Sequence, residues 1–124
     1  VTLKDLGQLD NSIKSLKKAL AIEPDYVQAH NNLGVTFQEL GQLDDAVKCY
    51  EKALSIEPDY AEAHNNLGIT FQELGQLDEA VKSYEKLFAI EPDYPQAHYN
   101  LGNALRGLGQ LDAAVKSYEK ALAI

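Results

Sequence analysis

A four-residue phrase that recurs at a constant interval constrains this chain more than any other feature. Gly-Gln-Leu-Asp appears four times at steps of 34 residues, beginning at Gly7, Gly41, Gly75 and Gly109. A second phrase, Glu-Pro-Asp-Tyr, recurs at the same step, at residues 23–26, 57–60 and 91–94. A fixed period in the range of about 20 to 50 residues indicates a stacked repeat array. Residues 27–60 and 61–94 differ at 8 of 34 positions, so the units are copies of one another.

We therefore predict one repeat array over residues 1–124. Its units are a partial repeat at 1–26, complete repeats at 27–60 and 61–94, and a last repeat at 95–124 that ends with its second helix. Within each unit, apolar residues follow a helical rather than a strand spacing, for example at Ala29, Leu33, Phe37 and Leu40. The predicted class is all-α, with two helices and one turn in each complete unit.

Glycine, proline and aspartate predict where the helices begin and end. Gly7 is expected to end a first helix, and Asp10 to begin the next, which runs to about Ile22. Capping boxes are expected where an aspartate precedes Glu or Gln by three residues, at Asp25 with Gln28, Asp59 with Glu62, and Asp93 with Gln96.

Gly34, Gly68 and Gly102 lie inside the predicted helices, where glycine costs about 1 kcal/mol of stability relative to alanine. We expect each of them to allow close approach of a partner helix's backbone. Leu87 and Phe88 add volume to the third unit, where we expect local spreading or a slightly shifted helix.

Charge and composition limit the kind of partner. The formal net charge is −8, and it is concentrated in residues 27–94, where acidic side chains outnumber basic ones. An acidic surface repels phosphate backbones, which argues against nucleic-acid binding and favours a neutral or basic partner.

No apolar run reaches the length of about 20 residues that membrane insertion requires. The first residues do not resemble a signal peptide, so we expect a cytoplasmic location. A single cysteine, Cys49, excludes a disulfide within the chain.

The repeated residues resemble the tetratricopeptide repeat, and the resemblance covers the whole chain. In residues 61–94 the matching positions are His64, Leu67, Gly68, Phe71, Ala80, Tyr84, Leu87 and Pro92. The departures are histidines in place of the usual tryptophan at His30, His64 and His98, leucines at Leu87 and Leu105, and Ser12 in place of an alanine. The resemblance implies antiparallel helix pairs stacked in a right-handed superhelical solenoid. It also implies that the first helices line a concave groove that binds an extended or helical peptide.

Transferring the family's groove positions to this sequence gives three sets of candidate peptide-binding residues. In the first complete unit they are Gln28, Asn31, Asn32, Val35, Gln38 and Glu39. In the second they are Glu62, Asn65, Asn66, Ile69, Gln72 and Glu73. In the last they are Gln96, Tyr99, Asn100, Asn103 and Arg106.

The predicted groove is rich in asparagine. Asn32, Asn66 and Asn100 form a column, which Asn31 and Asn65 double. A side-chain amide both donates and accepts hydrogen bonds, so such a column could hold the backbone of an extended peptide. This pattern is similar to the asparagine ladder in the repeat region of O-linked N-acetylglucosamine transferase. Alternatively, the amides bridge neighbouring helices. The carboxylate clamp known in the family requires basic groove residues, and Arg106 is the only one among these candidates.

No residue pattern indicates catalysis, a metal or another cofactor. The three histidines lie one per repeat, which would separate them by roughly 10 Å, whereas metal ligands lie about 2 Å from one shared ion. We therefore interpret them as packing residues. Cys49 occupies a position that is serine in the sister repeats, at Ser83 and Ser117, which argues against a tuned catalytic thiol. The sequence predicts a module that is not an enzyme and needs no cofactor.

Two further functions remain open beside groove binding of a protein or peptide partner. The last helix carries apolar residues at Tyr118, Ala121, Leu122 and Ile124, and the first unit lacks half of its first helix. Apolar end faces of this kind predict head-to-tail self-association, and hence a self-assembling scaffold. The asparagine column also allows the chain to be the substrate-recruiting repeat arm of an attached transferase.

Overall fold

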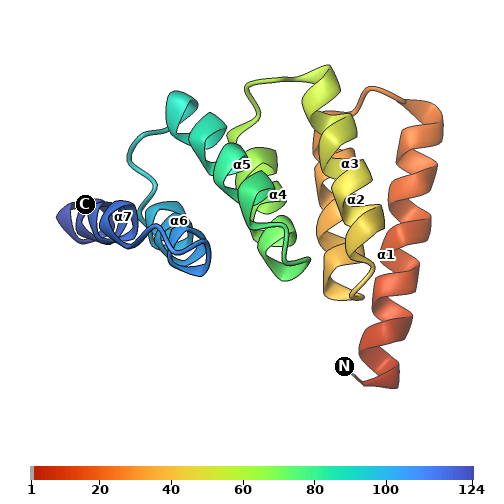
Figure 1. Cartoon of the computed structure of the whole chain (residues 1–124). Coiled ribbons are helices and arrows are strands. Elements are labelled where there is room, and N and C mark those ends of the chain that lie inside the picture. Colours follow the sequence, from red (N-terminus) through yellow and green to blue (C-terminus); the bar gives the residue numbers. More distant parts are fainter. Residues whose placement is uncertain (1) are drawn as a thin grey trace. The chain divides into compact units, whose positions relative to one another are not determined.

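The computed structural model describes residues 2–124, so Val1, the first residue of the predicted partial repeat, lies outside the described residues. Residues 2–124 form seven α-helices and no strand, which confirms the all-α prediction (Figure 1). The helices are α1 (Leu3–Ile22), α2 (Val27–Glu39), α3 (Leu43–Ile56), α4 (Ala61–Glu73), α5 (Leu77–Ile90), α6 (Pro95–Gly107) and α7 (Leu111–Ala123). They group into two compact units, the first ending at Ala63 and the second beginning at His64. None of these helices is both long and apolar enough to span a bilayer.

Short glycine turns join the helices of each pair. Gly41, Gly75 and Gly109 have φ angles of 78°, 77° and 80°, the left-handed backbone that glycine adopts without a steric penalty. At the first of these turns the amide of Gly41 donates to the Gln38 carbonyl at 3.0 Å, and that of Gln42 to the Phe37 carbonyl at 2.9 Å. These bonds satisfy carbonyls that a helix end leaves open. The predicted turns at these three glycines are confirmed.

The prediction for Gly7 is wrong. Helix α1 runs without interruption through Gly7 and Asp10, so the glycine ends no helix and the aspartate begins none. Thr2 caps α1 instead, because its hydroxyl accepts from the Asp5 amide at 3.1 Å while the Asp5 carboxylate accepts from the Thr2 amide at 3.3 Å. A continuous helix satisfies the backbone groups that a turn would otherwise expose.

The expected capping boxes are also absent from two helices. Tyr26 and Tyr94 are the N-cap residues of α2 and α6, and neither helix start has a side-chain cap hydrogen bond. Asp25 and Asp93 therefore lie one residue too early to cap. The backbone itself closes these starts, as where the Tyr26 carbonyl accepts from the amides of Ala29 and His30 at 3.1 and 3.2 Å. The box expected at Asp59 stays a prediction.

Each helix pair is held by a tyrosine that lies against a glycine. A Cβ atom added to Gly34 would lie 2.5 Å from Cε1 of Tyr50, and the same distance separates Gly68 from Tyr84 and Gly102 from Tyr118. The glycines therefore make room for an aromatic ring of the second helix. The prediction that they allow close approach of its backbone is wrong. The same faces of α3 and α5 carry small or apolar side chains that are fully buried, namely Ala46, Ala53, Ala80 and Leu87.

The added volume at Leu87 and Phe88 is accommodated without a change in helix length. Helix α5 has 14 residues, as α3 does, and Leu87 is fully buried. The local difference lies in the following turn. The Tyr26 and Tyr60 amides donate to the carbonyls of Glu23 and Glu57 at 3.2 and 3.1 Å, but the Tyr94 amide makes no such bond.

Candidate functional site

In the first unit, the predicted binding residues of α2 fall into an exposed and a buried group. Gln28, Asn32 and Glu39 are exposed, and Val35 and Gln38 are half-buried. Asn31 is fully buried, so its amide is not accessible to a ligand. The accessible part of this surface is therefore a row of polar side chains at helical spacing along α2.

In α4 and α6 the same positions give a similar division. Glu62 and Glu73 are exposed at the two ends of α4, Asn66, Ile69 and Gln72 are half-buried, and Asn65 is buried. On α6, Gln96, Tyr99 and Arg106 are exposed, while Asn100 and Asn103 are half-buried. Of the predicted double column of asparagines, Asn32 is exposed and Asn66 and Asn100 are half-buried, whereas Asn31 and Asn65 are buried.

Two of the predicted side-chain amides, those of Gln38 and Gln72, form hydrogen bonds to other helices. The Tyr50 hydroxyl donates to Oε1 of Gln38 at 2.8 Å, and the Tyr84 hydroxyl donates to Oε1 of Gln72. Nε2 of Gln72 in turn donates to the Asn100 carbonyl at 3.1 Å, which ties α4 to α6 within the second unit. Burial raises the pKa of Tyr84 well above its ordinary value, so its hydroxyl stays a donor at neutral pH.

The last repeat departs from this arrangement because Arg106 occupies the position of Gln38 and Gln72. The Tyr118 hydroxyl donates instead to Oδ1 of Asn103, one helical turn away, at 2.6 Å. Arg106 is left exposed in the last turn of α6. The sequence gives no direct signal for these tyrosine–amide bonds, apart from the constant spacing between each tyrosine and its amide in the first two complete units.

Tyr99 is an exposed aromatic on the predicted binding face of α6. Its side chain is 51% exposed, and its ring lies 5.8 Å from that of Tyr118 at an angle of 51°. Arg106 lies seven residues further along α6, so the two side chains share one side of the helix. Tyrosine and arginine are enriched among the residues that contribute most to protein–protein affinity. This face therefore has the composition of an interaction surface.

His30 and His98 each tie a repeat to the turn before it, a role that sequence reasoning missed. Nε2 of His30 lies 2.8 Å from the Pro24 carbonyl, and Nε2 of His98 lies 2.8 Å from the Pro92 carbonyl. Because a carbonyl only accepts, each Nε2 carries the proton. The recurring six-residue spacing of proline and histidine is the signal that could have predicted this bond. Within residues 2–124, no group of three or more His, Cys, Asp or Glu side chains is arranged to hold a metal.

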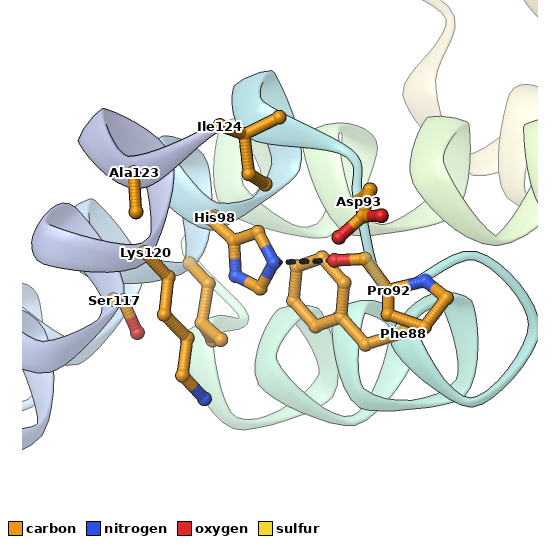
Figure 2. A pocket seen from close by; sticks show the side chains of 9 residues that line it. Phe88, Pro92, Asp93, His98, Ser117, Lys120, Ala123 and Ile124 are labelled. Carbon is orange, nitrogen blue, oxygen red and sulfur yellow. Dashed lines mark hydrogen bonds between the residues drawn. The ribbon is translucent and has the colours of Figure 1, made fainter.

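A pocket of about 480 Å³ surrounds His98 in the second unit (Figure 2). The His98 ring is stacked on Phe88, with centroids 3.9 Å apart and an interplanar angle of 4°. His98 is 6% exposed, and its buried Nδ1 has no hydrogen-bond partner. Figure 2 shows the ring between Phe88 and the side chains of Lys120 and Ser117. The stack and the bond to Pro92 fix the 91–94 turn against α6, which makes this pocket primarily a packing feature.

Cys49 does not have the surroundings of a nucleophile. Its side chain is half-buried, and burial raises the pKa of its thiol to about 11, with a further contribution from Asp45 that outweighs the opposing effect of Lys17. A reactive cysteine needs a lowered pKa, because the thiolate is the nucleophile. Cys49 is therefore a packing residue of α3.

Comparison with known families and structures identifies the class of this fold. A family profile described as TPR repeat matches residues 2–41 and 37–75, and one described as tetratricopeptide repeat matches residues 59–124. The chain belongs to the tetratricopeptide repeat family. No curated protein matches the sequence significantly.

Among solved structures, the chain is similar to MamA. Two crystal structures of MamA are each 31% identical, with TM-scores of 0.90 and 0.88 over 97% of this chain and 70% and 66% of theirs. A third MamA structure is 25% identical, with a TM-score of 0.84 over 97% of this chain and 66% of that one. The chain thus spans about two thirds of the length of these neighbours. Family and neighbours together support a protein-interaction or scaffold module built from helical repeats.

Proposed function

We propose that the exposed faces of the first helices, α2, α4 and α6, bind a peptide or protein segment and that the chain carries out no catalytic step. Accessible polar side chains at helical spacing on each of these helices support this proposal. On α6, the exposed aromatic side chain of Tyr99 supports it as well. The buried members of the predicted set, Asn31 and Asn65, contribute to packing and are not contacts in this proposal.

The observation that carries the proposal is the exposure of Tyr99. The other tyrosines at the helix pairs are buried or half-buried, with Tyr50 and Tyr84 fully enclosed. A tyrosine that remains 51% exposed on a helix face, with an exposed arginine two turns away, offers apolar area and hydrogen bonding together. Such a pair can anchor a partner side chain while the amides of Asn66 and Asn100, in the same unit, hold its backbone.

Charge favours a neutral or basic ligand for α2 and α4. Glu39, Glu62 and Glu73 are exposed on these helices, and no lysine or arginine occurs within Val27–Glu39 or Ala61–Glu73. Opposite charges speed association and disfavour acidic competitors. Arg106 on α6 is the exception, and an acidic group of the ligand would lie there.

Selection from a random peptide library, followed by titration of the selected peptides, tests this function. We expect Tyr99→Ala to weaken the affinity at least about tenfold, as an anchor residue does. Tyr26→Ala is a matched control, since Tyr26 is an exposed tyrosine at the start of α2. Equal affinity of the Tyr99→Ala variant and the unaltered chain for every selected peptide would contradict the proposal.

A second candidate function is self-association through the end faces. Leu111, Val115 and Leu122 form an exposed apolar stripe on α7, with Leu122 88% exposed. In α5 the counterpart of the first of these, Leu77, lies against Gly107 of α6, so there the same face packs on the following first helix. Light scattering over a concentration series should show a rising mass that Val115→Lys suppresses. A monomer at millimolar concentration would exclude this candidate.

A further inference from the structure

Nδ1 of His98 is a buried acceptor for which the fold supplies no donor. Nε2 of this ring carries the proton and lies 2.8 Å from the Pro92 carbonyl, so Nδ1 keeps a lone pair. His98 is buried, and among residues 2–124 no atom donates a hydrogen bond to its Nδ1. A buried acceptor without a donor costs stability, and folded proteins contain few of them. Nδ1 is therefore a candidate contact for a ligand.

The orientation of the His98 ring directs this acceptor into the pocket of about 480 Å³. Phe88 covers one face of the ring at a centroid distance of 3.9 Å, and the bond to Pro92 holds its opposite edge. Figure 2 shows Nδ1 on the side of the ring away from Pro92, toward the part of the pocket where Ser117 and Lys120 lie. The stack and the bond together keep Nδ1 facing the other lining side chains.

The rest of the pocket combines apolar walls with charges at its rim. The apolar lining residues are Phe88, Pro92, Leu101, Ala123 and Ile124. Lys120 and Asp93 are both exposed, and Figure 2 shows them on opposite sides of the His98 ring. A cavity of several hundred Å³ with apolar walls and a few placed polar groups is typical of a site for a small molecule.

This pocket lies on a face of the second helix that the following first helix leaves open. Lys86, Ala89 and Ile90 of α5 lie one repeat before the lining residues in the last turns of α7. All three are exposed, although α6 follows α5 and packs against it. The corresponding face therefore stays accessible inside the array as well. Phe88 is particular to this site, because Leu54 occupies its position one repeat earlier.

An aromatic carboxylic acid with an N–H or O–H donor would complement these groups. Its ring would lie against the apolar walls, and its donor would bond to Nδ1 of His98. Its carboxylate would lie beside Lys120 and away from Asp93, because like charges repel. Since Nδ1 is enclosed, such a ligand reaches it when a lining side chain such as Leu101 changes rotamer.

We propose that the pocket around His98 binds a small aromatic carboxylic acid, with Nδ1 of His98 accepting a hydrogen bond from the ligand and Lys120 pairing with its carboxylate. The site lies within the second unit. It goes beyond the proposed function, because none of the residues predicted to bind a peptide lines this pocket. Pro92 and Asp93 belong to the turn before α6, so a bound ligand also stabilises that turn.

Indole-3-acetate is a suitable probe, since it combines an aromatic ring, one N–H donor and a carboxylate. It is titrated into the full chain, labelled with ¹⁵N, while long-range ¹H–¹⁵N correlations report the ring nitrogens of the three histidines. We expect the Nδ1 signal of His98 to shift and saturate, with a dissociation constant on the order of 1 mM for a ligand of this size. The rings of His30 and His64 lie outside this pocket and serve as internal references.

A matched ligand and a matched pair of variants test the two polar contacts separately. Benzothiophene-3-acetate has the same shape without the N–H, and it should bind about tenfold more weakly because it leaves Nδ1 unpaired. Lys120→Met should weaken the binding of indole-3-acetate about twofold to fivefold, the size expected for an exposed ion pair. Lys116→Met is the control, since Lys116 is an exposed lysine of α7 that does not line the pocket. It should leave the affinity unchanged.

Several outcomes would overturn the proposal. If the His98 signal does not saturate with indole-3-acetate up to about 10 mM, ten times the expected constant, the pocket is not a site for this class of ligand. Equal affinity for the two acids would show that Nδ1 accepts no bond from the ligand. Equal weakening by Lys116→Met and Lys120→Met would mean a general attraction to the charge of α7.

The peptides selected for the proposed function complete the test. They should leave the Nδ1 signal of His98 unchanged, and Tyr99→Ala should not alter the binding of indole-3-acetate. Failure of the peptide-binding function and failure of this pocket are therefore distinguishable. A selected peptide that competes with indole-3-acetate would place a protein segment in the pocket, which contradicts a separate site for a small molecule.

Discussion

The same tetrapeptide, Gly-Gln-Leu-Asp, has two different structures in this chain. At Gly41, Gly75 and Gly109 it turns the backbone between two packed helices, with φ near 80°. At Gly7 it continues a single helix of 20 residues. Local sequence cannot explain this difference, because even the flanking leucines are shared at Leu6 and Leu40.

What differs is the packing on either side of the glycine. Ahead of Gly41, α2 lies against α3 with the Tyr50 ring on Gly34, and this contact is possible only if the chain reverses. Among residues 2–124 no helix packs on α1 in this way, and Leu16, the counterpart of Tyr50, is half-buried. Packing of the two helices therefore stabilises the turn between them. The glycine allows the backbone to turn but does not force it to do so.

The largest effect should come from the glycine–tyrosine contact. Gly34→Ala places a methyl group 2.5 Å from Cε1 of Tyr50, whose fully buried ring has little room to move. We expect the free energy of unfolding to fall by about 1 to 3 kcal/mol, as overpacked cores show. Urea unfolding followed by circular dichroism measures this change. Stability equal to that of the unaltered chain would show that the contact does not hold the pair.

The turn glycine should matter somewhat less. Gly41→Ala forces alanine into a left-handed backbone, at a cost of roughly 1 to 2 kcal/mol. Nothing lies within 4 Å of the added Cβ, so the cost is conformational alone. The same urea titration checks it, with Gly75→Ala and Gly109→Ala as replicates. A stabilising effect at all three positions would contradict the turn geometry.

The tyrosine–amide brace should contribute about 1 kcal/mol, the usual net value of a hydrogen bond. Tyr84→Phe keeps the ring against Gly68 and removes only the hydroxyl that donates to Gln72. We expect a loss of stability of this size in thermal unfolding, and a similar loss for Tyr50→Phe, which breaks the bond to Gln38. A Tyr84→Phe variant as stable as the unaltered chain would show that this hydrogen bond does not contribute to stability.

At Gly7, in contrast to Gly34 and Gly41, replacement of glycine by alanine should stabilise the chain. Gly7→Ala replaces a helical glycine with the best helix former, and no atom lies within 4 Å of the new Cβ. We expect a gain of about 0.5 to 1 kcal/mol in the helix, visible as slower amide hydrogen exchange in α1. Faster exchange would mean that Gly7 adopts a turn in solution.

The smallest effect concerns Cys49, which has no bearing on stability at neutral pH. Since its pKa is raised to about 11, the thiolate population and the rate of alkylation by iodoacetamide should still rise about tenfold per pH unit between pH 8 and 10. The thiolate is disfavoured in the folded chain, so folding stability is unaffected below the unfolded pKa and falls as the pH rises beyond it. A rate that levels off near pH 9 would contradict the burial of this thiol.

The sequence predicted the fold because the repeat period and the helical spacing are strong, local signals. The turns at Gly41, Gly75 and Gly109 follow from the same signals. Gly7 could not be predicted, because its conformation depends on whether a packed helix precedes it. The capping boxes at Asp25 and Asp93 failed because each helix begins after the following tyrosine, so the aspartate is out of reach.

The candidate site was less predictable than the fold. Family positions located the polar face of α2 and the exposed pair of Tyr99 and Arg106. They could not separate accessible amides from Asn31, which is enclosed, or from Gln72, which is held by two hydrogen bonds. Burial and bonding of this kind depend on neighbouring helices, and one repeat's sequence does not contain that information.

The distance between the two ends of α1 tests the central claim most directly. Spin labels at Lys4 and Lys18, both exposed, would report it by pulsed electron resonance, with Cys49→Ser removing the native thiol as in the sister repeats. A continuous helix predicts a Cα separation of about 21 Å for these 14 residues. A turn at Gly7 would bring the two Cα atoms to roughly 14 Å, since the helix axes would lie about 10 Å apart and Lys18 about 10 Å further along its helix. A distribution centred near the longer distance supports the account, and one centred near the shorter distance contradicts it.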